Sequence, residues 1–277
     1  MKIVIIVMIL TLFIGIIDAT PLVWHSAHVL KTKSFLFQTN FSYTKTSYRY
    51  DYNTNSWQIL SSNTATTTFS PELMLGYGVF NNFEIKIAIP IAYKSKASDR
   101  SFGFGDVMIK TRYNLINRKS ILFTIAGAMT LPTSPTTANP LIDDHTLDIA
   151  FGGYLFTKEY KRFTSDFRFG YFYNGTNNNI KIGNLFEYFI KFDYKLTPGL
   201  IPYVSFFGTI QAKNKNLANN LLVPNSERVR HNFQLGGVYK ISNELTLRVR
   251  IIKPLKIISK GGEIPNYSFG IDFWFIK

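Results

Sequence analysis

The most constraining feature of the sequence is a strict alternation of apolar and polar side chains over residues 83–94. Every second position holds a large apolar residue, namely Phe83, Ile85, Ile87, Ile89, Ile91 and Tyr93. The positions between them hold Glu84, Lys86, Ala88, Pro90, Ala92 and Lys94. Successive side chains of a β-strand point to opposite faces, so this segment predicts a strand with one bulky apolar face and one polar or small face.

The same alternation returns at residues 186–195, 244–251 and 267–275. A soluble β-sandwich also alternates, but it rarely places Phe, Tyr and Ile at nearly every position of one face across so many strands. A barrel strand in a membrane faces lipid on one side and a polar interior on the other. Charged residues make up 17% of the chain, against roughly 25% in an ordinary soluble domain. The sequence therefore predicts an all-β fold, a transmembrane antiparallel β-barrel.

Turn signals divide the chain into about twelve strands, within limits of roughly 10 to 14. We predict strands near residues 33–46, 65–80, 83–96, 104–116, 120–132, 145–157, 163–174, 183–195, 200–212, 230–241, 244–255 and 266–277. Short turns and long loops alternate between them, which is typical of an up-and-down barrel with both chain ends in the periplasm. Four prolines fall inside these strands, and we expect bulges or strand ends at Pro71, Pro90, Pro202 and Pro254.

The first residues have the character of a secretory signal peptide. Lys2 precedes an apolar run from Ile3 to Ile17, and Ala19 supplies a small residue at a cleavage point. The run is shorter than the ~20 residues of a spanning helix, which disfavours the alternative of an uncleaved anchor. We expect a signal peptide at residues 1–19 and a barrel at 20–277, placed in the outer membrane of a Gram-negative-type bacterium.

The charge distribution predicts a polar lumen with basic rims. On the predicted inward face, acidic and basic side chains are balanced, so the net charge of +14 falls on loops, turns and termini. The predicted pore-lining residues are Glu84, Lys86, Asp106, Lys110, Arg112, Asp166, Arg168, Glu187, Lys191, Asp193, Arg248, Arg250 and Asp272. The remaining basic residues are dispersed, which argues against nucleic acid as a partner and leaves membrane lipids as expected neighbours.

Residues that could carry chemistry are sparse. The chain has no cysteine, which excludes disulfides and thiolate metal sites, and its four histidines show no metal-ligand spacing. The one cluster of acidic residues with a histidine is Asp143-Asp144-His145, at the entry of a long loop into a strand, where aspartates are common. No serine lies in a G-x-S-x-G context. We therefore predict no catalytic residue, no metal and no cofactor.

Three consecutive segments resemble a known family. Residues 75–80 read Leu-Gly-Tyr-Gly-Val-Phe, residues 83–90 begin the Glu-containing alternation and end in Pro90, and residues 103–115 begin Gly-Phe-Gly-Asp. With Leu131-Pro132-Thr133, this region resembles the transporter-like outer-membrane proteins related to the meta-pathway phenol-degradation protein. The resemblance covers about residues 69–133 and implies an outer-membrane barrel for passage of small, often hydrophobic or aromatic, molecules. It supplies no catalytic residues.

The carboxyl end departs from the usual barrel pattern. Outer-membrane barrels usually close on a terminal aromatic residue that the barrel-assembly machinery reads, whereas this chain ends Phe273-Trp274-Phe275-Ile276-Lys277. We expect that machinery and a small-molecule solute as partners. The leading hypothesis is a passive channel or transporter. The alternatives are a structural or surface-interaction barrel without an open pore and, third, a lipid-acting enzyme.

Overall fold

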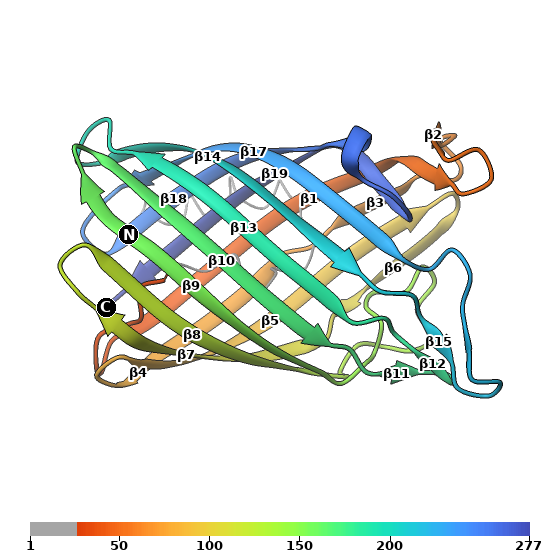
Figure 1. Cartoon of the computed structure of the whole chain (residues 1–277), viewed down its shortest axis with the longest axis horizontal. Coiled ribbons are helices and arrows are strands. Elements are labelled where there is room, and N and C mark those ends of the chain that lie inside the picture. Colours follow the sequence, from red (N-terminus) through yellow and green to blue (C-terminus); the bar gives the residue numbers. More distant parts are fainter. Residues whose placement is uncertain (1–26) are drawn as a thin grey trace.

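The computed structural model describes residues 27–277, apart from the side chains of residues 158 and 159. The signal peptide predicted at residues 1–19 lies outside the described residues. Strands form the whole wall (Figure 1), and the helical structure in the described region is a single turn, η2 (Lys256–Ile258). No helix among the described residues is long and apolar enough to cross a bilayer.

The wall has twelve strand positions, as predicted. Ten of them are single strands: β1 (Phe35–Asp51), β5 (Phe83–Lys96), β8 (Ile121–Leu131), β9 (Asp148–Tyr160), β10 (Phe163–Tyr173), β13 (Leu185–Tyr194), β14 (Leu200–Gln211), β17 (Arg228–Lys240), β18 (Leu245–Pro254) and β19 (Glu263–Ile276). Two positions are split, into β3 (Thr66–Phe69) with β4 (Glu72–Phe80) and β6 (Asp99–Phe104) with β7 (Val107–Asn117). A short strand, β2 (Ser56–Ile59), pairs antiparallel with the last residues of β1.

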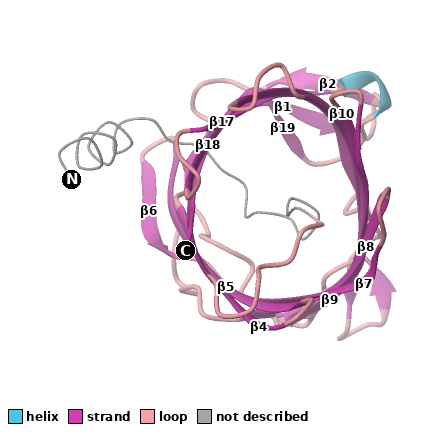
Figure 2. Cartoon of the chain, turned by 90° about the vertical axis from the view of Figure 1, so that its left-hand side faces the viewer, coloured by secondary structure: helices cyan, strands magenta, loops and turns pink. Residues whose placement is uncertain are grey.

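Antiparallel pairing closes the wall into a barrel. Each strand pairs with its sequence neighbour, and β19 returns to β1 with Phe41 opposite Ile271. Figure 2 looks along the barrel from its left-hand end in Figure 1 and shows the strands forming a complete ring. The short turns and the carboxyl terminus lie at that end, here called the turn end, and the long loops lie at the other, the loop end (Figure 1). The predicted up-and-down barrel is confirmed.

The first interruption divides the strand predicted at 65–80, and β6 occupies residues predicted as the loop between the strands at 83–96 and 104–116. The first interruption lies at Ser70-Pro71 and the second at Gly105-Asp106. Both interruptions lie beside Pro90 of β5. Up to Pro90, β5 pairs with β4 and β7, and after Pro90 it pairs with β3 and β6. Proline cannot donate to a ladder, so the wall bends and changes pairing where two prolines lie on adjacent strands.

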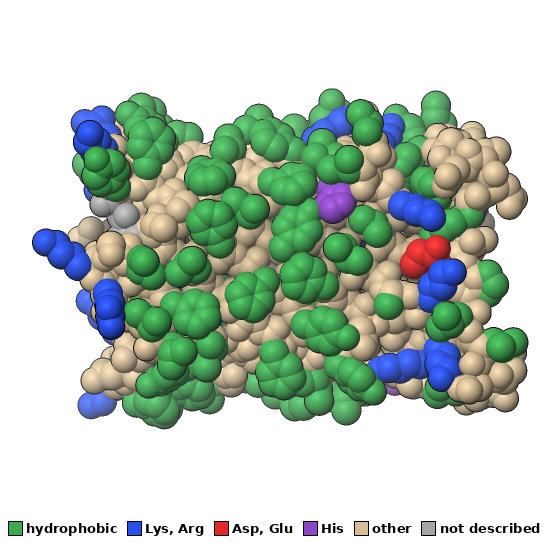
Figure 3. Space-filling view, viewed as in Figure 1, with side chains coloured by type: hydrophobic (Ala, Val, Ile, Leu, Met, Phe, Trp, Pro, Cys, Tyr) green, Lys and Arg blue, Asp and Glu red, His purple; other side chains and the backbone are tan. Residues whose placement is uncertain are grey.

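The outer surface is a belt of large apolar side chains. Phe151 is 65% exposed and Phe169 51% exposed. Many other large apolar side chains of the wall are also more exposed than is usual on the surface of a soluble protein. Figure 3 shows these side chains covering the middle of the barrel, with Lys and Arg gathered towards its two ends. Continuous apolar surface of this extent is typical of a lipid-facing wall and not of a soluble monomer.

Two of the predicted long loops pair with each other at the loop end. Residues 175–182 contribute β11 (Thr176–Asn177) and β12 (Ile180–Lys181), and residues 213–229 contribute β15 (Lys215–Asn216) and β16 (Leu221–Leu222). These strands form a separate four-stranded sheet in the order β11-β12-β15-β16. The loop at 132–147 contacts the interrupted wall beside β6 instead, where Ser101 Oγ donates to the carbonyl of Pro140 at 2.6 Å.

Candidate functional site in the barrel lumen

The inner side of the wall carries the predicted pore-lining residues. Eleven of them are buried, between 0% and 7% exposed: Glu84, Lys86, Asp106, Lys110, Arg112, Asp166, Arg168, Glu187, Asp193, Arg250 and Asp272. The side chains of Lys191 and Arg248 are each 17% exposed. Asp106 differs from the others because it lies in the interruption between β6 and β7 and not within a regular strand. The rest project inward from strands, as the two-residue period requires.

One cluster of charges joins β5 and β7. Glu84 is fully buried, and its Oε1 accepts a hydrogen bond from Nε of Arg112 at 2.6 Å. The same oxygen lies 2.9 Å from Nζ of Lys86, two residues along the strand. Glu84 and Arg112 are direct cross-strand partners in the ladder. The carboxylate is therefore shared by two cations, which offsets the cost of placing charge away from water.

A second cluster joins β18 and β19. Asp272 is fully buried, and its Oδ2 accepts hydrogen bonds from Nε of Arg248 at 2.6 Å and from Nη1 of Arg250 at 2.8 Å. On β10, Nε of Arg168 donates to Oδ1 of Asp166 at 2.8 Å. Charges two residues apart on one strand share a face, so part of this pairing follows from the alternation itself.

Lys110 connects opposite sides of the lumen. It projects from β7, is 2% exposed, and interacts electrostatically with Glu72 of β4 and Glu187 of β13. Polar side chains of other strands are also buried, including Tyr154 of β9 and Gln234 of β17. We call the following charged residues together the ion-pair layer: Glu84, Lys86, Lys110, Arg112, Asp166, Arg168, Glu187, Arg248, Arg250 and Asp272. The members of this layer come from β5, β7, β10, β13, β18 and β19, and most of them are shielded from solvent.

Residues 27–34, the amino-terminal segment, enter the lumen from the turn end (Figure 2). The backbone N–H of Leu30 donates to Oε2 of Glu84 at 2.7 Å. Arg112 Nη2 donates to the carbonyl of His28 at 3.0 Å, and Thr124 Oγ1 donates to the carbonyl of Ala27 at 2.5 Å. The ion-pair layer therefore also anchors this segment. Sequence reasoning did not find it, because the segment has no periodicity and its partners lie 54 to 97 residues away.

Two adjoining cavities lead from the loop end to the layer. The outer one, the mouth cavity, has a volume of about 540 Å³ and is bordered by Arg49, Tyr52 and Glu263. The inner one has a volume of about 250 Å³ and shares Arg228 and Arg230 with the mouth cavity. Glu187 and Arg250 of the ion-pair layer also border the inner cavity. The polar interior is thus accessible from the loop end down to the layer.

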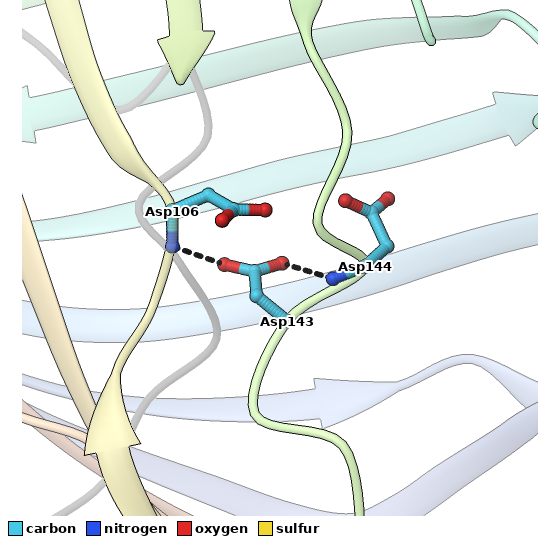
Figure 4. Close-up of side chains that lie close together, drawn as sticks. All are labelled: Asp106, Asp143 and Asp144. Carbon is cyan, nitrogen blue, oxygen red and sulfur yellow. Dashed lines mark hydrogen bonds between the residues drawn. The ribbon is translucent and has the colours of Figure 1, made fainter. Parts of the chain in front are cut away.

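Three aspartates converge where the wall is interrupted. Figure 4 shows Asp143 between Asp106 and Asp144, with its carboxylate directed at their backbone nitrogens. One oxygen of each carboxylate lies within 4.8 Å of the others. Asp143 accepts the backbone N–H groups of Asp106 at 3.1 Å and of Asp144 at 3.0 Å, and Asp106 accepts that of Ser134 at 2.7 Å. The Asp143 carboxylate thus satisfies the backbone N–H of Asp106, which has no ladder partner at the break, and the Asp106 carboxylate binds the loop in turn. The cluster therefore joins the loop at 132–147 to the interrupted wall.

The histidine of this region does not complete an acid–base arrangement. Nδ1 of His145 lies 2.6 Å from the carbonyl oxygen of Ser134, so the ring is held by the backbone and not by Asp143 or Asp144. In this loop, burial raises the pKa of the Asp144 carboxyl to about 6, and the nearby Asp143 and Asp148 carboxylates raise it as well. Burial also raises the pKa of Asp143.

A closed barrel with an apolar outer belt and a charged, paired interior defines an outer-membrane β-barrel protein. Residues 21–260 match the family described as "Putative MetA-pathway of phenol degradation", and the chain belongs to that family. The resemblance seen at residues 69–133 is therefore confirmed. No curated protein matches the sequence.

Solved structures share the fold at low sequence identity. An outer membrane channel from Pseudomonas putida F1 matches with a TM-score of 0.78 and 12% identity, over 94% of this chain and 100% of that one. The β domain of the Bordetella autotransporter BrkA matches with a TM-score of 0.53 and 11% identity, over 88% and 99%. The NanC porin matches with a TM-score of 0.50 and 9% identity, over 87% and 98%. At these identities the similarity establishes the fold alone.

Proposed function

We propose that the protein is an outer-membrane channel or transporter for the passive passage of small molecules, hydrophobic or aromatic ones included. The observation that carries the proposal is the pair of cavities that leads from the loop end to the ion-pair layer. A barrel with a purely structural role would not need a polar interior that is accessible from the loop end. The similarity in fold to the channel from Pseudomonas putida F1 supports the same function.

In this proposal the ion-pair layer controls passage. Both signs of charge alternate within it, although two cations share each of the carboxylates of Glu84 and Asp272, so that a solute crossing the layer meets neither a continuous cationic nor a continuous anionic wall. Passage requires the paired side chains to separate, and the amino-terminal segment to leave its contacts with Glu84 and Arg112. The predicted pore-lining residues are then the residues that the solute passes, and rings of wall charge set selectivity.

A second candidate function is a structural or surface-interaction barrel without an open pore. The burial of the ion-pair layer favours it, because Glu84 and Asp272 are fully shielded from solvent. The basic side chains at the two ends of the barrel would then contact anionic lipid or surface partners. We propose outer-membrane lipids as neighbours in either case, and the barrel-assembly machinery as the partner during insertion.

Planar-bilayer conductance tests the proposal. The protein from Thr20 onward is refolded, its closed barrel is verified by heat-dependent mobility on a gel, and currents are recorded with a salt gradient. Discrete conductance steps with defined ion selectivity support a channel. A folded barrel that remains silent in wild-type form and after Glu84→Ala, which removes the anchor of the amino-terminal segment, would favour the second candidate function.

A further inference from the structure

The inner cavity combines two kinds of wall that together suit one class of ligand. Its apolar side includes Leu185, Phe207 and Ile252, from β13, β14 and β18. Phe207 packs against Phe189 with ring centroids 5.9 Å apart, and Ile252 contacts this pair. This part of the lumen is therefore a preformed apolar surface inside an otherwise charged interior. Apolar surface held open beside polar groups is typical of small-molecule sites.

Basic side chains border the same cavity from β17 and β18, and β17 lies between β14 and β18 in the wall. Three arginines border it, Arg228, Arg230 and Arg250, and Glu187 is the one carboxylate among the described residues that do so. Arg228 and Arg230 lie side by side, since atoms of both come within 3.3 Å of the position that a Cβ on Gly262 would take. Arg228 is exposed and borders the cavity. Two adjacent guanidinium groups repel a cation and attract an anion, because a guanidinium matches a carboxylate with two parallel hydrogen bonds.

The size of the cavity limits the ligand. A volume of about 250 Å³ lies below the roughly 300–1,000 Å³ of sites for drug-sized molecules. An inorganic anion would leave the apolar wall uncovered, and a neutral hydrocarbon would offer no acceptor to the guanidinium N–H groups of Arg228 and Arg230. A compact apolar body that bears one negative charge satisfies both walls.

We infer that the inner cavity is a binding site for small organic monocarboxylates with an apolar body, oriented with the carboxylate towards Arg228 and Arg230 and the body against Phe207 and Ile252. This inference rests on the proposed function and names its substrate class. The site adjoins the ion-pair layer through Arg250, which also binds Asp272 at 2.8 Å. A bound carboxylate therefore sits at the point where the solute must begin to cross the layer.

Binding of benzoate to the detergent-solubilised full-length barrel tests the inference, with benzyl alcohol and inorganic phosphate as comparison probes. Equilibrium dialysis is expected to show saturable binding of benzoate, much weaker binding of benzyl alcohol, and little displacement by phosphate. Arg228→Gln is expected to weaken benzoate binding about tenfold, the range of one charge-assisted contact. Ile252→Thr, which keeps a branched side chain in the strand, is expected to weaken it about threefold.

Arg118→Gln is the matched control, because Arg118 is an exposed arginine at the turn end, remote from the inner cavity. Absence of saturable benzoate binding, equal binding of benzyl alcohol, equal displacement by phosphate, or equal weakening by Arg118→Gln would each overturn the inference. Conductance recorded on the same samples separates it from the proposed function. A barrel that conducts without binding benzoate refutes the carboxylate site alone, whereas one that binds benzoate but never conducts refutes the channel alone.

Discussion

Removing the carboxylate of Glu84 tests whether the ion-pair layer holds the amino-terminal segment in the lumen. In the structure this one side chain binds Arg112, Lys86 and the backbone N–H of Leu30, at 2.6, 2.9 and 2.7 Å. Glu84→Ala leaves two buried cations without their shared anion. Loss of one partner from a buried pair typically costs about 3–5 kcal/mol of folding free energy.

The part of this cost that falls on the segment can be estimated separately. A hydrogen bond to a charged group contributes about 1.5–3 kcal/mol, and each 1.4 kcal/mol is about a tenfold change in an equilibrium. The detached population of residues 27–34 should therefore rise about 10- to 100-fold. In hydrogen exchange measured by mass spectrometry, the peptide that contains Leu30 should exchange faster by the same factor, and channel openings should become more frequent.

The control is Glu263→Ala, which removes the carboxylate of a pair with Arg49 at the loop end. That pair is partly exposed, with side-chain exposures of 51% and 25%, so its loss should cost at most about 1 kcal/mol and leave Leu30 unaffected. Unchanged exchange at Leu30 in a correctly folded Glu84→Ala barrel would refute the anchoring role. Equal acceleration in both variants would show general loosening of the barrel and refute it as well.

Three further changes have defined outcomes. Arg248→Gln should shift the reversal potential in a salt gradient towards cation selectivity, because it removes a basic side chain, 17% exposed, from the ion-pair layer. An unchanged reversal potential would show that Arg248 does not line the conducting path. In the loop at 132–147, the pKa of Asp144 is raised to about 6 from a value near 3.8 in the unfolded chain. The stability that this carboxyl contributes is therefore present in full below pH 3.8 and is lost as the pH rises through 6. Exchange at residues 132–147, corrected for intrinsic rates, should therefore be slower at pH 5 than at pH 8, and Asp144→Asn should reduce the difference, since Asp143 retains a raised pKa. Gly78→Ala should impair assembly, because its Cβ would lie 1.9 Å from the carbonyl oxygen of Lys31; normal yield and normal heat-dependent mobility would contradict this.

The strands could be predicted from the sequence because lipid and lumen impose opposite demands on alternate residues. Ile85 and Ile87 are exposed on the outer surface while Glu84 and Lys86 are buried inside, as the two-residue period requires. The pairing of Asp166 with Arg168 is also readable, since the two residues share a face two positions apart. Period alone therefore fixed which side chains face inward.

Contacts that depend on how strands are staggered could not be read in the same way. The approach of Lys110 to Glu72 and Glu187 depends on the closure of the ring, which no local pattern encodes. The breaks at Ser70-Pro71 and Gly105-Asp106 required knowing that Pro71 and Pro90 lie on adjacent strands. The path of residues 27–34 into the lumen depends on distant partners on β5, β7 and β8.

In the proposed channel, the ion-pair layer would allow a barrel of this size to remain selective. Buried ion pairs add little net stability, but separating one exposes charge to a dry interior at a cost of several kcal/mol. Water or a polar solute entering from the inner cavity can replace the lost partner, whereas an uncharged apolar surface cannot. On the proposed function, the layer would therefore open most readily for a solute that brings its own charge or hydrogen-bonding group, and selectivity would follow from the energetics of pairing without a rigid constriction.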